Sequence, residues 1–120
     1  MRLKILTLAA VMAATPALAH APKIGANGGP QTDAGSFHVE VVPAGTTLAV
    51  YVRDHADKAV QTGGFKGTAI FVVDGKPQRI PLEPAGENKL TGTSPVALPA
   101  EPKGAVQITA PDGRTVQAKF

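Results

Sequence analysis

The sequence lacks cysteine and tryptophan and has little methionine and few aromatic residues. Its 120 residues include two Met, one Tyr and four Phe. Without cysteine the chain can form neither a disulfide framework nor a thiolate metal site. So few aromatic side chains leave no platform on which nucleic-acid bases could stack, and Lys and Arg are not clustered. We therefore expect one small domain held by its apolar core, with no nucleic-acid partner.

The first 19 residues have the pattern of a cleaved signal peptide. Arg2 and Lys4 precede an apolar run, which is followed by Pro16 and the small-residue site Ala17-Leu18-Ala19. The apolar run is about a dozen residues long, whereas a bilayer-spanning helix needs about 20. We expect cleavage after Ala19, a periplasmic or secreted protein, and no membrane span after processing.

Removal of this segment changes the composition that matters for function. Processing takes away 2 of the 12 Lys and Arg and none of the 9 Asp and Glu, so the formal charge falls from +3 to +1. Both methionines, Met1 and Met12, are also removed. The basic character of the whole chain is then no argument for an anionic partner. Any metal site in residues 20–120 must use nitrogen and oxygen ligands.

The rest of the chain divides into an arm and a β domain. Residues 20–35 are rich in Gly and Pro and predict an irregular N-terminal arm. From residue 36 apolar and polar residues alternate, which predicts strands separated by turns. The expected strands cover residues 36–42, 47–53, 68–73, 78–82, 89–93, 105–109 and 115–120. Seven short strands predict an antiparallel, Ig-like β-sandwich or a partly open barrel over residues 36–120.

The first two of these strands predict a hairpin. Alternation gives each strand one apolar face, made of Phe37, Val39 and Val41 in the first and of Leu48, Val50 and Val52 in the second. A register in which paired residue numbers sum to 89 joins the two faces. In that register His38 lies opposite Tyr51, and His55 projects beyond the ladder near Ala34.

Common catalytic motifs are absent from the sequence. It contains no G-x-S-x-G elbow, no H-E-x-x-H pair and no nucleophilic cysteine. The glycine-rich stretch at residues 63–68 has the wrong spacing for a phosphate-binding loop, and a strand is expected after it. We therefore expect no enzymatic activity.

Three histidines are the candidate chemistry of the processed chain. His20 becomes the N-terminal residue, where its α-amine and ring Nδ1 can chelate Cu(II). His38 and His55 fall on the side of the hairpin away from the predicted core. Glu40 and Asp54 are further oxygen ligands, or they fix the histidine rings. An arm that folds back would bring these residues into one metal site, for copper or zinc.

Each histidine also has a structural explanation. His20 can follow the cleavage site by chance, His38 can hydrogen-bond Tyr51 or Glu40, and His55 can be a polar turn residue. A second function, in which the histidines are incidental, is then a non-catalytic interaction module. Such a module would dock on an envelope complex through its polar sheet face or an edge strand.

Several segments of the chain carry a family resemblance. They are the Asn27-Gly28-Gly29 motif within residues 20–29, and residues 33–42, 50–55 and 86–92. Together they resemble small exported bacterial proteins and domains associated with heavy-metal, especially copper, resistance and efflux. The resemblance implies a periplasmic metal-binding protein for sequestration or delivery, with a heavy-metal efflux adaptor as partner. It matches His20, His38 and His55 to the histidines of that group, and Glu40 and Asp54 to its carboxylates.

Overall fold

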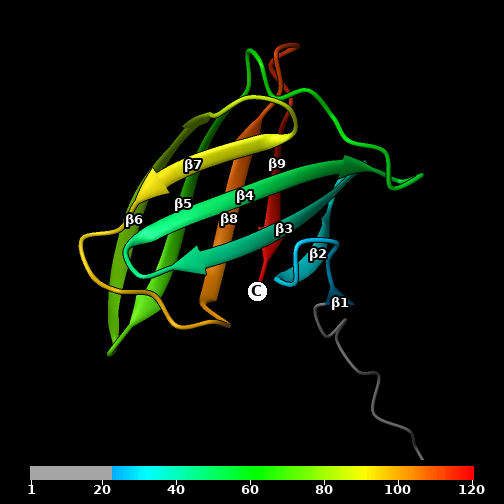
Figure 1. Ribbon diagram of the computed structural model, residues 1–120. Helices are drawn as coiled ribbons and strands as arrows, with labels where there is room; N and C mark the ends of the chain where they lie inside the picture. Colours follow the sequence, from blue (N-terminus) through cyan, green and yellow to red (C-terminus); the bar gives the residue numbers. More distant parts are fainter. Residues whose placement is uncertain (1–22) are drawn as a thin grey trace, which may run out of the picture.

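The computed structural model describes residues 23–120, a part of the chain built from strands and turns without a helix (Figure 1). Its strands are β1 (Lys23–Ile24), β2 (Pro30–Ala34), β3 (Phe37–Ala44), β4 (Thr47–Asp54), β5 (Lys66–Val73), β6 (Lys76–Pro84), β7 (Lys89–Thr93), β8 (Lys103–Thr109) and β9 (Thr115–Lys119). Residues 23–120 contain no helix that could cross a membrane. The predicted signal peptide and His20 lie outside the described residues.

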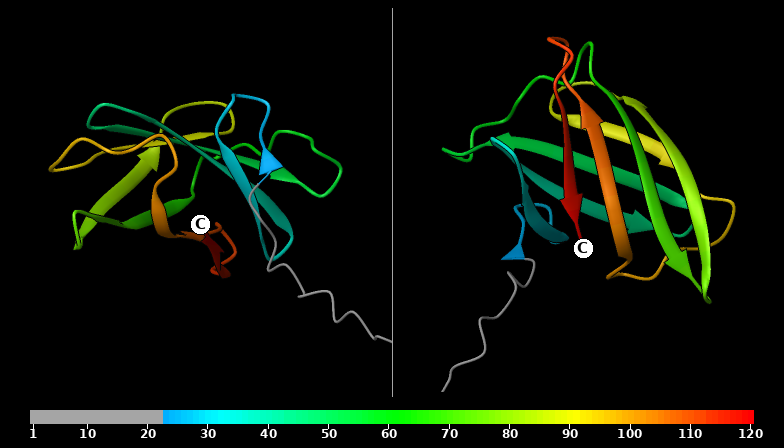
Figure 2. Two further views of the ribbon diagram at one scale, coloured as in Figure 1. Left: turned by 90° about the horizontal axis from the view of Figure 1, so that it is seen from below. Right: turned by 180° about the vertical axis from the view of Figure 1, so that it is seen from behind.

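The strands form one antiparallel sheet that curls into a half-barrel. Their order across the sheet is β1-β2-β3-β4-β7-β6-β5-β8-β9. In Figure 1 the layer of β3, β4 and β7 crosses in front of the layer of β5, β6, β8 and β9, and Figure 2 shows the same layers from below and from behind. The curl brings β2 against β9 without backbone pairing between them. The prediction of an all-β, antiparallel fold is confirmed.

All seven predicted strands are present, as β3 to β9, and two more precede them. The segment expected to be an irregular arm differs, because Pro30–Ala34 forms β2 and pairs with β3. The turn Gly35-Ser36 fixes this pairing, since Gly35 takes a positive φ of 57° between the partners Ala34 and Phe37. Ala34 is buried in the core. Because the residues between Pro30 and Ala34 are polar, the sequence pattern does not indicate this strand.

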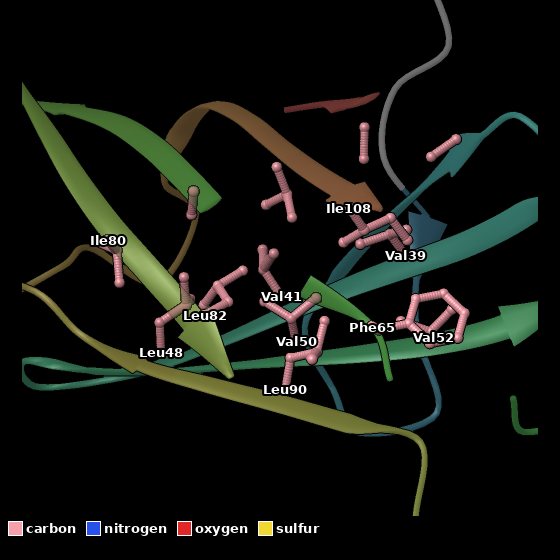
Figure 3. Close-up of a cluster of buried hydrophobic side chains, with 14 of the residues drawn as sticks. Val39, Val41, Leu48, Val50, Val52, Phe65, Ile80, Leu82, Leu90 and Ile108 are labelled. Atoms are coloured by element: carbon pink, nitrogen blue, oxygen red, sulfur yellow. The ribbon is translucent and has the colours of Figure 1, made fainter. Parts of the chain in front are cut away.

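The apolar faces of the strands meet inside the curl of the sheet (Figure 3). The predicted inward residues Val39, Val41, Leu48, Val50 and Val52 have no solvent-exposed surface. They pack with side chains of the other layer, among them Phe71, Ile80 and Ile108. Full burial of a Val, Leu, Ile or Phe side chain contributes about 1.5–3 kcal/mol. This core holds the described part of the chain without any disulfide.

The register expected for the first hairpin is wrong by two residues. The pairs are His38 with Arg53 and Glu40 with Tyr51, so paired numbers sum to 91. The chain remains extended through Ala44, and the turn is the two-residue Gly45-Thr46, with Gly45 at φ 61°. Glycine at the first position of such a turn is the signature of the type II′ hairpin. A shift of two residues keeps every side chain on its face, which is why the alternation alone did not distinguish the registers.

Candidate functional site

His38 and His55 lie side by side on the outer side of the β3–β4 hairpin. Their ring centroids are 5.4 Å apart, and the ring planes meet at 83°. His38 projects from β3 away from the core, and His55 is the first residue after β4. The observed register places Arg53 opposite His38, so His55 is only two residues further along. The corrected register therefore brings the two imidazoles closer together than the sequence predicted.

Two carboxylates flank the His38 ring, one near each ring nitrogen. Its Nδ1 lies 2.9 Å from Oδ1 of Asp57, and its Nε2 lies 3.4 Å from Oδ1 of Asp33. In the neutral tautomer that donates its Nδ1–H to Asp57, the Nε2 lone pair is available to a metal ion. The side chain of His38 is 19% exposed, so part of it reaches the surface. A ring oriented through Nδ1, with Nε2 as the donor, is the usual arrangement of a metal-ligating histidine.

Sequence reasoning missed both Asp33 and Asp57. Asp33 is the direct partner of His38 across β2 and β3, but its segment was not recognised as a strand. Asp57 has a positive φ of 59°, which turns the loop after β4 back toward His38. The available signal was the Asp-His-Ala-Asp sequence at residues 54–57, in which the second Asp is a typical left-handed turn residue.

Asp54 organises the loop that carries His55 and Asp57. Its Oδ1 accepts the backbone N–H groups of Ala56 at 2.9 Å and Lys58 at 3.0 Å. The backbone carbonyl of Asp54 also accepts the N–H of Asp57 at 3.0 Å. Through these hydrogen bonds Asp54 positions the side chains of His55 and Asp57, which face His38.

Glu40 lies two residues from His38 on the same side of β3, but the loop of residues 25–29 covers it. Its side chain is buried, with 1% exposure. One carboxylate oxygen accepts the N–H groups of Asn27 and Gly29, each at 2.9 Å, and the other accepts the Asn27 side-chain amide at 3.0 Å. These hydrogen bonds between the Asn27-Gly28-Gly29 motif and Glu40 join the loop to β3, and we call them the latch. We leave Glu40 out of the proposed ligand set because its oxygens are occupied.

A shallow hollow of about 200 Å³ adjoins His38. Gln31 and Asp57, which both contact Nδ1 of His38, form part of its wall, together with Ile24, Gly25, Ala26 and Arg53. The hollow therefore reaches from residues near the start of the described chain to side chains that contact His38. His20 precedes Lys23 by three residues, a span of at most about 11 Å in an extended chain.

The centroid spacing of the His38 and His55 rings is one that two imidazoles on a shared metal ion adopt. Two imidazoles bound to one ion through bonds of about 2.0–2.1 Å have centroids about 4–6 Å apart, and His38 and His55 fall in this range. Neighbouring donors on one ion lie about 2.8–3.4 Å apart, which includes the distance from His38 Nε2 to Asp33 Oδ1. Among residues 23–120, no group of three His, Asp, Glu or Cys side chains is already spaced to hold a metal ion. The described residues thus supply a histidine pair that needs a further ligand.

Comparison with protein-family models, curated proteins and solved structures finds no match for this chain. The resemblance to copper-resistance proteins stays a prediction.

Proposed function

We propose that the protein is an exported, periplasmic metal-binding protein that sequesters or delivers one divalent ion, copper or alternatively zinc. The observation that carries the proposal is the pair of imidazoles, His38 and His55, with ring centroids 5.4 Å apart beside a surface hollow. Histidines brought together from a strand and a loop can share an ion, whereas isolated surface histidines cannot.

The donor chemistry favours copper. Imidazole nitrogens, an N-terminal amine and carboxylate oxygens suit Cu(II), and the chain has no thiolate to offer a softer ion. In the proposed site His38 and His55 bind through ring nitrogens, and Asp57 holds His38 in the correct tautomer. His20, three residues before Lys23 in the sequence, supplies the further ligand. The resemblance to copper-resistance proteins supports the same ion.

The test is titration of the protein recovered from the periplasm of an expressing bacterium. We expect close to one Cu(II) per chain, with nitrogen hyperfine structure in the electron paramagnetic resonance spectrum. The double variant His38→Gln and His55→Gln should lose at least about 100-fold in affinity, because two ligands are removed. The exposed Gln61→Ala variant is the control and should bind as the parent does. Equal affinity in the parent and the double histidine variant would refute the proposal.

A further inference from the structure

A second surface of the molecule is unusual for a small sheet protein. Ile70 and Val72 project from the outer face of β5, where alternation normally places polar residues, and they are 44% and 50% exposed. They stand two residues apart on one strand and so form a continuous apolar strip. The outer side of the neighbouring strands adds Pro77, the partner of Val72, and Ala105, a partner of Ile70.

Cations surround this apolar strip. Arg79 pairs with Ile70 across β5 and β6, and Lys103 pairs with Val72 across β5 and β8. Lys119 of β9 pairs with Ala105. In the part of the chain from residue 23 onward, none of these three cations lies in an ion pair. We call Ile70, Val72, Arg79, Lys103 and Lys119 the basic face.

We propose that the basic face is a docking site for an acidic protein surface that presents apolar side chains between its carboxylates. Protein interfaces place apolar residues at the centre and charged residues at the rim, which is the arrangement of the basic face. An acidic partner supplies carboxylates to these cations, and attraction between opposite charges speeds encounter. A shallow hollow of about 90 Å³ can receive one partner side chain. It is lined by Ile70, Arg79, Ala105 and the polar residues Thr68, Gln107 and Gln117.

The composition of this face favours a protein over a membrane. Proteins that lie on a membrane anchor themselves with Trp, Tyr or Phe side chains at the lipid interface. In β5, β6 and β8 the one aromatic residue is Phe71, which points into the core and has no exposed surface. The basic face also belongs to a different layer of the fold from His38 and His55 (Figure 1). A docked partner and a bound metal therefore do not compete for the same residues.

The experiment titrates ¹⁵N-labelled protein with a short peptide of alternating Glu and Leu residues. A matching peptide of Lys and Leu is a second probe, and vesicles of phosphatidylethanolamine and phosphatidylglycerol are a third. We expect saturable binding of the acidic peptide, with amide shift changes concentrated in β5, β6 and β8. No saturable binding, binding of both peptides alike, or binding to the vesicles alone would overturn the proposal.

Matched variants separate this site from general charge attraction. The pair Arg79→Glu and Lys103→Glu should weaken acidic-peptide binding by roughly tenfold or more. The pair Lys23→Glu and Lys58→Glu changes the net charge equally on exposed residues of the other layer, and it should leave the affinity within about twofold. Ile70→Thr with Val72→Thr keeps β-branched residues on the strand and should also weaken binding. Equal losses in the two charge-reversed proteins would contradict a local docking face.

Discussion

Glu40 binds Asn27 through both the backbone and the side chain of that residue: its carboxylate accepts the Asn27 N–H at 2.9 Å and the Asn27 amide at 3.0 Å. We predict that Glu40→Gln destabilises the protein by about 1–3 kcal/mol, because an NH₂ group then faces backbone donors in a buried site. Urea unfolding measures this change. The exposed Glu83→Gln is the control, expected within about 0.5 kcal/mol of the parent. A Glu40→Gln protein as stable as the control would show that the latch contributes nothing.

Gly29 lies where the loop of residues 25–29 passes closest to β3. A Cβ atom at this position would overlap the backbone carbonyl oxygen of Val41. We expect Gly29→Ala to cost about 2 kcal/mol or more in unfolding free energy, because backbone atoms must move. Gly63→Ala is the matched control, since nothing lies within 4 Å of its Cβ position. Thermal unfolding of both variants measures the difference, and similar midpoints would contradict the close packing of this loop.

Asp57 orients His38 through the 2.9 Å contact to Nδ1. An amide in place of this carboxylate accepts a weaker hydrogen bond, and its NH₂ can instead donate to Nδ1, which moves the ring proton to Nε2. Changes of this kind behind a metal-ligating histidine lower metal affinity by about 10–100-fold. We therefore expect Asp57→Asn to weaken Cu(II) binding by that amount while the fold is retained, since Asn also tolerates positive φ. Asp74→Asn, at a positive-φ turn position between β5 and β6, is the control. If both variants bind copper equally well, Asp57 has no role in the site.

The N-terminal amine is tested by extending the processed chain. A protein that begins at His20 should bind Cu(II) more tightly than one with a single extra residue before His20, since the extension removes the amine from the chelate. Intact mass of the exported protein first establishes whether cleavage follows Ala19. Titration then compares the two forms. Unchanged affinity in the extended form would exclude the His20 α-amine as a ligand.

Much of the fold was predictable because the core follows a strict period of two. Val39 and Val41 flank Glu40, Val50 and Val52 flank Tyr51, and this period of two identified both strands and their inward faces. Alternation carries no information on a shift of two residues, so the register depended on the choice of turn. The sequence did not predict β2 because one of its faces carries Gln31 and Asp33, and the other carries Pro30, Thr32 and Ala34, none of them a large aliphatic or aromatic residue.

The site was predictable only in part, because its residues act through contacts distant in sequence. His38 and His55 were identified from their shared side of the hairpin, and the structure places their rings together. Glu40 looked equally accessible by alternation, yet a loop 11 to 13 residues away covers it. Asp33 could not be predicted as a site residue, because it lies near His38 only through the pairing of β2 with β3.

The histidine pair is tested by ¹⁵N NMR of the imidazole nitrogens during titration with Zn(II), a diamagnetic ion that imidazole also binds well. One equivalent of Zn(II) should shift a ring nitrogen of His38 and a ring nitrogen of His55 together, with saturation at one ion per chain. Nε2 should be the nitrogen of His38 that shifts, because Nδ1 is held by Asp57. If Zn(II) binds while both rings keep their signals, or if only one ring responds, the two histidines do not share a metal ion.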